Sequence, residues 1–98
     1  MQSQDFHDFV EEVIEKNDIA EVISEYVKLK RVGSRYAALC PLHNDKKSPS
    51  LSISPDKQLF HCFGCGAGGN VIHFIMAAEN LDFTDALKYL ANRAHIPI

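Results

Sequence analysis

Two short motifs in the middle of the chain carry soft metal ligands at matched spacing. They are Cys40-Pro-Leu-His43 and Cys62-Phe-Gly-Cys65, with 18 residues between them. Two residues between ligands suit a tight turn that aims both side chains at one point. Three thiolates and one imidazole are a typical donor set for tetrahedral zinc. A single buried Cys or His is usually core filler, but two such pairs together favour a bound metal ion. The predicted ligands are Cys40, His43, Cys62 and Cys65.

The predicted zinc is structural, because four protein ligands leave no coordination position for an activated water. An odd count of three cysteines fits a closed disulfide framework poorly. An iron–sulfur cluster is the less favoured alternative, since such clusters more often have four cysteines. A zinc deaminase is not indicated, because the H-x-E part of its signature is absent.

The remaining histidines are not expected to bind the metal. Strand alternation points His61, next to Cys62, to the opposite face of its strand. The other three, His7, His73 and His95, are expected in helices, as surface or packing residues.

Helices and hairpins must position the two motifs. Apolar spacing predicts an amphipathic helix from Asp5 to Lys16, and Asp18 followed by Glu21 indicates a capped second helix up to Tyr26. Period-two patterns predict a hairpin over 27–40, turning at Gly33-Ser34, and another over 51–63, turning at Pro55-Asp56. Each hairpin then delivers one ligand pair near a strand end.

Two further helices are expected after the second motif. Glycines 66, 68 and 69 indicate flexible backbone, and Asn70 caps the first of these helices. The second begins at 80–82, with inward-facing apolar residues. Those residues are Phe83, Ala86, Leu87, Leu90, Ala91 and Ala94.

The length and composition predict one α+β domain. A chain of 98 residues is too short for two cores, and 46% hydrophobic with 23% charged residues is ordinary for a globular protein. The expected parts are helical residues 1–26, metal-binding hairpins 27–65 and C-terminal helices 66–98. No apolar run approaches the ~20 residues of a membrane span. The acidic, amphipathic start does not resemble a secretory signal, so we expect a cytoplasmic protein without membrane contact.

The charge distribution indicates a nucleic-acid surface on the hairpins. Residues 1–27 carry a net charge of −7, residues 28–62 carry +5 and residues 63–98 carry −1. Cations beside exposed aromatic rings suit single-stranded nucleic acid, because they neutralise phosphate while the rings stack on unpaired bases. The alternative is a solvated charged rim over a core-facing aromatic stripe. We expect Phe60 in the core and the neighbouring His61 and Phe63 on the other face.

The motifs resemble the N-terminal zinc-binding domain of bacterial DNA primases. The run CPLHNDKKSPSLSISPDKQLFHCFGCGAGGNVIHFIM, residues 40–76, follows that family's pattern, and DIAEVISEYVKLKRVGSRYAALC, residues 18–40, also matches. The resemblance implies a zinc ribbon, with a small antiparallel β-sheet of hairpins flanked by N-terminal and C-terminal helices. It also implies the four zinc ligands named above. In that family the domain binds single-stranded DNA template and helps to select the start site for RNA primer synthesis.

The resemblance also suggests residues for the template surface. Three departures affect them: the family usually has one Lys where this chain has Lys46-Lys47, Leu51 replaces an aromatic residue, and the base after Gly33 is shifted by one position. A one-residue shift along a strand changes face, so Arg35 is expected to contribute less than Lys57. The candidate DNA contacts are Arg35, Lys46, Lys47, Pro49, Ser50, Lys57, His61 and Phe63.

A primase of this kind would be an enzyme, but these residues alone are expected to lack catalysis. The scattered acids form no cluster suited to two magnesium ions. Magnesium therefore belongs to a separate catalytic domain, downstream in the same chain or acting in trans. A replicative helicase would be contacted through other domains. The alternatives are a zinc-stabilised protein-interaction module and a primase-like domain of a phage or mobile-element helicase.

Overall fold

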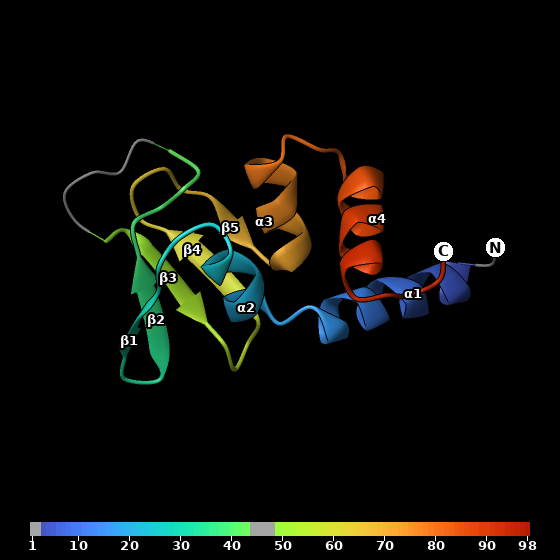
Figure 1. Cartoon of the computed structure of the whole chain (residues 1–98), viewed down its shortest axis with the longest axis horizontal. Helices are drawn as coiled ribbons and strands as arrows, with labels where there is room; N and C mark the ends of the chain where they lie inside the picture. Colours follow the sequence, from blue (N-terminus) through green and yellow to red (C-terminus); the bar gives the residue numbers. More distant parts are fainter. Residues whose placement is uncertain (1–2, 44–48) are drawn as a thin grey trace.

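The structure, a computed structural model, describes residues 3–43 and 49–98. Along the chain, helices precede and follow an antiparallel sheet, which confirms the expected α+β organisation (Figure 1). The elements in chain order are α1 (Ser3–Lys16), α2 (Ile19–Ser24), β1 (Lys30–Val32), β2 (Arg35–Ala38), β3 (Leu51–Ser54), β4 (Leu59–Cys62), β5 (Gly68–Gly69), α3 (Val71–Ala78) and α4 (Phe83–Arg93).

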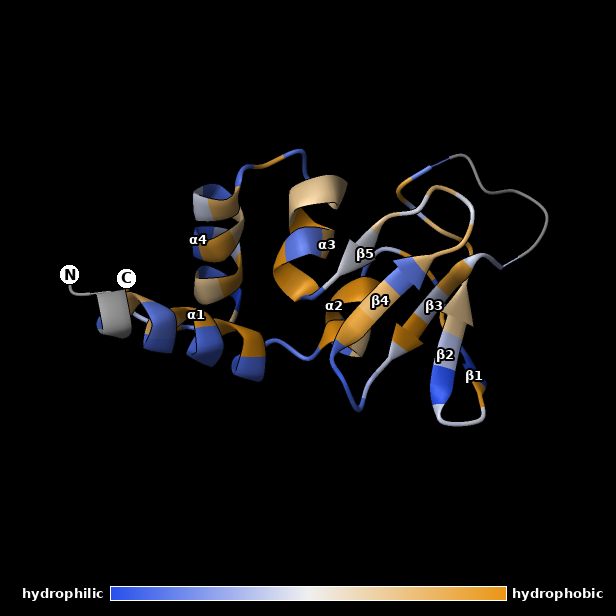
Figure 2. Ribbon diagram, turned by 180° about the vertical axis from the view of Figure 1, so that it is seen from behind, coloured by the Kyte–Doolittle hydropathy of each residue, from blue (hydrophilic) through white to orange (hydrophobic). Residues whose placement is uncertain are grey.

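The sheet has the strand order β1-β2-β3-β4-β5, and every neighbouring pair is antiparallel. Alternation along β3 and β4 buries Leu51, Ile53, Phe60 and Cys62 on one face. The opposite face carries Ser52, Ser54, Leu59 and His61, and we call it the open face. Figure 2 shows this sheet with α2 behind it.

Aromatic contacts join the buried face of the sheet to the helices. The ring of Phe74 on α3 packs edge-to-face against Phe60, with ring centroids 5.5 Å apart, and against Tyr26, at 5.3 Å. Helix α4 packs against α3 and α1. The molecule is therefore elongated, at 46 × 27 × 20 Å, with the sheet at one end and α1 and α4 at the other (Figure 1).

Side-chain caps fix the starts of three helices. The Asp18 carboxylate accepts from the backbone N–H of Glu21, and Asn70 accepts from Ile72 and His73, as the sequence predicts. At α3 the His73 imidazole accepts in return from the Asn70 N–H, at 3.1 Å. Helix α4 begins after Asp82, whose side chain accepts from the Asp85 N–H.

Several sequence-based boundaries are wrong by a few residues. Strand β1 starts at Lys30 and not at Val27, because the Val27 N–H bonds to the Ile23 carbonyl and prolongs the turn after α2. Gly68 and Gly69, predicted as flexible backbone, instead form strand β5, which pairs with β4. His95 lies after α4 with a positive φ of 59°, so it is not helical.

Phe83, predicted to face inward, is 37% exposed, because it occupies the first turn of α4, where the helix is not yet covered. The other residues predicted on that face are buried or half-buried. Within residues 3–43 and 49–98, no helix has both the length and the apolarity needed to cross a membrane.

Candidate metal centre and the groove beside it

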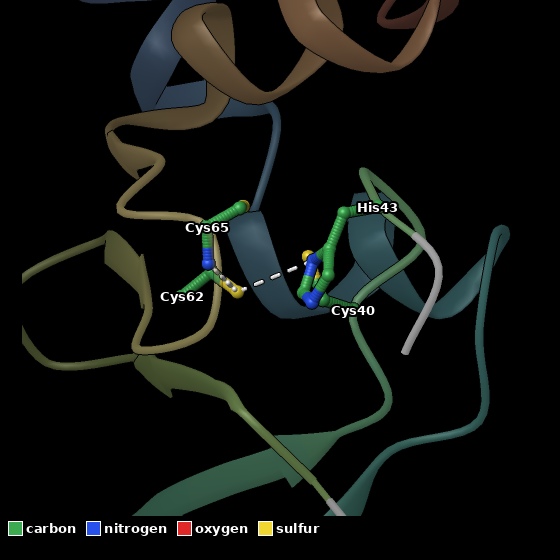
Figure 3. Close-up of side chains that lie close together, drawn as sticks. All are labelled: Cys40, His43, Cys62 and Cys65. Carbon is green, nitrogen blue, oxygen red and sulfur yellow. Dashed lines mark hydrogen bonds between the residues drawn. The ribbon is translucent and has the colours of Figure 1, made fainter. Parts of the chain in front are cut away.

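The sheet brings the two ligand motifs together. Strands β2 and β4 both run antiparallel to β3. They therefore point the same way, and their C-terminal ends lie on the same side of the sheet. Cys40 follows the end of β2 by two residues, and Cys62 is the last residue of β4. Figure 3 shows the four side chains converging from these two turns. The predicted hairpin arrangement therefore places both motifs at one point.

The donor atoms of Cys40, His43, Cys62 and Cys65 all lie within 4.8 Å of one another. The Nδ1 atom of His43 is 3.7 Å from the Cys62 sulfur (Figure 3). In a tetrahedral zinc site with Zn–S bonds of ~2.3 Å, ligand sulfurs are about 3.8 Å apart. The cluster therefore has a size and a donor set that fit one zinc ion.

Backbone and glycine geometry support this site. The backbone N–H of Leu42 donates to the Cys40 sulfur and that of Cys65 donates to the Cys62 sulfur, each at 3.4 Å. Such donors stabilise thiolates, the form that binds zinc. At Gly64, a Cβ atom would lie 2.7 Å from His43 Nε2. The absence of a side chain at Gly64 thus leaves the room that the His43 ring occupies.

The two buried cysteines differ in acidity. Burial raises the pKa of the Cys40 thiol to about 12. Burial also opposes ionisation of Cys62, but hydrogen bonds from the Ser50 hydroxyl and the backbone N–H groups of Cys65 and Gly64 lower the pKa of Cys62 to about 6. Zinc must displace any proton from its ligands, so acid weakens binding at this site.

A shallow groove of about 220 Å³ lies on the open face of the sheet. The rings of His61 and Phe63 meet edge-to-face along one part of it, with centroids 4.6 Å apart, and Phe63 is 75% exposed. We call this hollow the sheet groove. It is lined by Arg35, Ser52, Ser54, Lys57, Leu59, Phe60, His61 and Phe63.

Half of the predicted DNA contacts meet in the sheet groove, namely Arg35, Lys57, His61 and Phe63. Arg35 lies on the same face as His61, although the shifted turn suggests otherwise. Pro49 is exposed, while the Ser50 hydroxyl is 3.4 Å from the Cys62 sulfur and so faces the metal cluster. Lys46 and Lys47 lie outside the described residues.

Sequence reasoning missed two kinds of residue. Ser52 and Ser54 line the groove, and alternation alone would have placed them on the face of His61. Gly64 and Gly68 allow the His43 and His61 rings to lie close to the backbone, and no local pattern reveals such contacts. Tyr36, which the sequence placed among the aromatic residues of the hairpins, pairs with Ile53 on the buried side and contacts Arg31, so it does not line the groove.

A small antiparallel sheet with a four-donor Cys/His cluster at the ends of its strands defines a zinc ribbon. The chain belongs to the CHC2 zinc finger family, whose pattern matches residues 6–98.

Similar proteins are bacterial primases. The chain is 53% identical over 89 residues to the DNA primase of Thermotoga maritima, covering 91% of this chain and 16% of that protein. It is 50% identical over 91 residues to the DNA primase of Clostridium acetobutylicum, covering 93% and 15%. The chain thus spans about one seventh of the length of these relatives.

A solved structure shares the fold. It is the crystal structure of the Aquifex aeolicus primase, containing zinc-binding and RNA polymerase domains. The likeness has a TM-score of 0.84 at 41% identity, covering 92% of this chain and 22% of that one.

Proposed function

We propose that this chain is the zinc-binding domain of a DNA primase, and that its open face binds single-stranded template during initiation of RNA primers. The proposal is supported by the kinship with DNA primases and by the sheet groove, which combines two cations with two neighbouring rings. Exposed rings on a basic sheet suit unpaired bases.

Zinc would act as a structural ion held by Cys40, His43, Cys62 and Cys65. The metal ties the end of β2 to the end of β4, and β4 carries His61 into the groove. A rigid pair of hairpins would present the groove without a further ordering cost on binding. The other candidate contacts, Pro49, Ser50, Lys46 and Lys47, would extend this surface.

The cations of the groove are available to a ligand. Among the described residues, neither Arg35 nor Lys57 forms an ion pair or a side-chain hydrogen bond. By contrast, Arg31 donates to the Gly33 carbonyl at 2.9 Å and lies over the Tyr36 ring. The unpaired charges of Arg35 and Lys57 are the single observation that best supports template binding.

The remaining parts of primase action would lie outside these residues. Polymerisation and its magnesium ions would belong to a catalytic domain in the same chain or in trans, by analogy with the Aquifex aeolicus primase, which has an RNA polymerase domain beside its zinc-binding domain. Contact with a replicative helicase would use other domains. The setting would be the bacterial cytoplasm, at the replication fork.

Template binding can be tested by titrating labelled single-stranded oligonucleotides into the zinc-loaded chain at low and high salt. With three or four phosphates contacted, we expect a slope of log affinity against log salt of about −2 to −3. Lys57→Glu should weaken binding about tenfold or more, because it replaces an attraction by a repulsion. Lys88→Glu makes the same charge change at an exposed position of α4 and is the matched control. An affinity that changes neither with salt nor in the Lys57→Glu variant would reject the proposal.

A second candidate is docking of a partner protein at the helical end. Phe6 on α1 is 45% exposed. Helix α1 lies at the opposite end of the molecule from the sheet (Figure 1). If the chain captures a partner in a salt-independent way that Phe6→Ala abolishes, this docking function is favoured.

A further inference from the structure

The floor of the sheet groove contains two serine hydroxyls that neither the sequence motifs nor the metal site explains. Ser52 and Ser54 alternate with buried Leu51 and Ile53 on β3, so their side chains lie on the open face. Among the described residues, neither hydroxyl has a hydrogen-bond partner. These groups are therefore free to bond to a molecule that enters the groove.

The register of the sheet surrounds His61 with small residues. Ala37, Ser52, His61 and Gly68 are directly paired across β2, β3, β4 and β5. A Cβ atom at Gly68 would lie 3.2 Å from His61 Nδ1, so a larger residue there would crowd the ring. The imidazole is consequently flanked by Ser52 and Gly68, while Ala37 lies one strand further away.

The size of the groove limits what can enter it. Its volume of about 220 Å³ is below the ~300 to 1,000 Å³ of pockets that enclose drug-sized ligands. One planar group fits this space better than several nucleotides do. The rings of His61 and Phe63 offer a stacking surface, and Arg35 and Lys57 lie where flanking phosphates could pair with them.

From this arrangement we infer that the sheet groove is a single-base recognition pocket, in which the Ser52 and Ser54 hydroxyls bond to the polar edge of one unpaired template base. This inference rests on the proposed template-binding function. A single hydroxyl both donates and accepts, so alone it can bond to any base. Two hydroxyls at fixed positions on one strand favour the base whose edge places a polar group opposite each of them.

The inference assigns different roles to the two kinds of groove residue. Arg35 and Lys57 supply affinity that does not depend on sequence, since phosphates are the same at every position. Ser52 and Ser54 supply discrimination between bases. The two contributions can therefore be separated by substitution.

The test uses the zinc-loaded chain and labelled oligothymidylates that carry one central test base, either adenine, cytosine, guanine or thymine. Fluorescence anisotropy gives the four affinities. We expect the wild type to prefer at least one base, and Ser52→Ala or Ser54→Ala to reduce that preference about threefold to tenfold. Ser52→Thr keeps the hydroxyl and should retain the preference. Ser34→Ala, in the turn between β1 and β2, is the control outside the groove.

The outcomes separate this inference from the proposed function. Salt-sensitive binding with no base preference in the wild type, or with an unchanged preference in both alanine variants, would overturn the base pocket alone. Binding that ignores salt and Lys57→Glu would overturn template binding and the base pocket together. Circular dichroism of each variant confirms that the fold is retained.

Discussion

The two ends of the molecule use their charged side chains differently. At the helical end, Arg93 pairs with Glu25 and donates to the Asn17 side chain at 3.1 Å, so it joins α4 to the chain around α2. At the sheet end, Arg35 and Lys57 have no such partner among the described residues. Arg93 at the helical end joins two parts of the fold, whereas Arg35 and Lys57 in the sheet groove are left for a ligand.

The two ends also differ in what stabilises them. The helices share one continuous apolar core with the buried face of the sheet, and this core includes Leu90, Phe74 and Phe60. The turns that carry the ligand motifs contribute little apolar surface, and Cys65 and Phe63 are exposed there. We infer that packing stabilises the helical end and that zinc stabilises the turns beside the groove.

The largest expected effect is loss of zinc. Structural zinc binds small domains with apparent free energies of about 10 to 16 kcal/mol, which is as large as the ~5 to 15 kcal/mol stability of a typical domain. A strong chelator, or Cys62→Ser, should therefore unfold the hairpins. Circular dichroism and amide exchange of the sheet strands measure this.

The control for this prediction is the helical end. Amide protection in α4 should fall less than protection in β3 and β4, because α4 contacts α3 and α1 and not the metal turns. A metal-stripped chain that keeps the native spectrum would show that zinc is dispensable, and the contrast between the two ends would fail.

A smaller effect is expected from Leu90→Ala in α4. Leu90 is fully buried, and removing such a side chain costs about 2 to 5 kcal/mol of unfolding free energy. Leu59→Ala is the matched control, since Leu59 is 43% exposed on the open face and should cost about 0.5 kcal/mol or less. Denaturant unfolding compares the two. Equal losses would contradict the placement of Leu90 in the buried core and of Leu59 on the exposed face of the sheet.

A third, weaker effect concerns the buried amide of Asn17. Its Nδ2 donates to the carbonyls of Val13 and Leu90, at 2.8 and 3.0 Å. Asn17→Ala leaves buried groups unpaired and should cost about 1 to 3 kcal/mol. Asn92→Ala, at an exposed position of α4, should change stability little. If thermal melts ranked the two variants in the opposite order, the result would contradict the role of Asn17 as a polar link between α1 and α4.

Acid should affect the metal end first. Protons compete with zinc for its ligands, and with no metal bound the pKa of Cys62 is lowered to about 6, so the metal-free thiolate contributes stability that is lost as pH falls through that value. Zinc release on acidification, followed with a colorimetric zinc indicator, should therefore precede unfolding of α4. Simultaneous loss of both would contradict the separation of the two ends.

The sequence predicted the parts of this fold that local chemistry determines. Spacing identified the ligand motifs, and capping residues such as Asp18 and Asn70 located the helix starts. Alternation placed Phe60 in the core and His61 on the other face. These features depend on residues close in the chain.

Features that depend on contacts between distant residues could not be predicted. Strand β5 consists of two glycines, which carry no strand pattern, and it forms because Gly68 and Gly69 pair with β4. The meeting of Arg35 and Lys57 in one groove needs the register of three strands. The partnership of Arg93 with Glu25 likewise spans most of the chain.

The most direct test of the account is to map which backbone amides respond to a ligand. An isotope-labelled, zinc-loaded chain would be titrated with short oligothymidylate while its amide signals are followed by nuclear magnetic resonance. We predict shifts at Arg35, Ser52, Lys57 and His61, with α1 and α4 unchanged. Shifts confined to α1 and α4, or none at all, would contradict template binding on the open face.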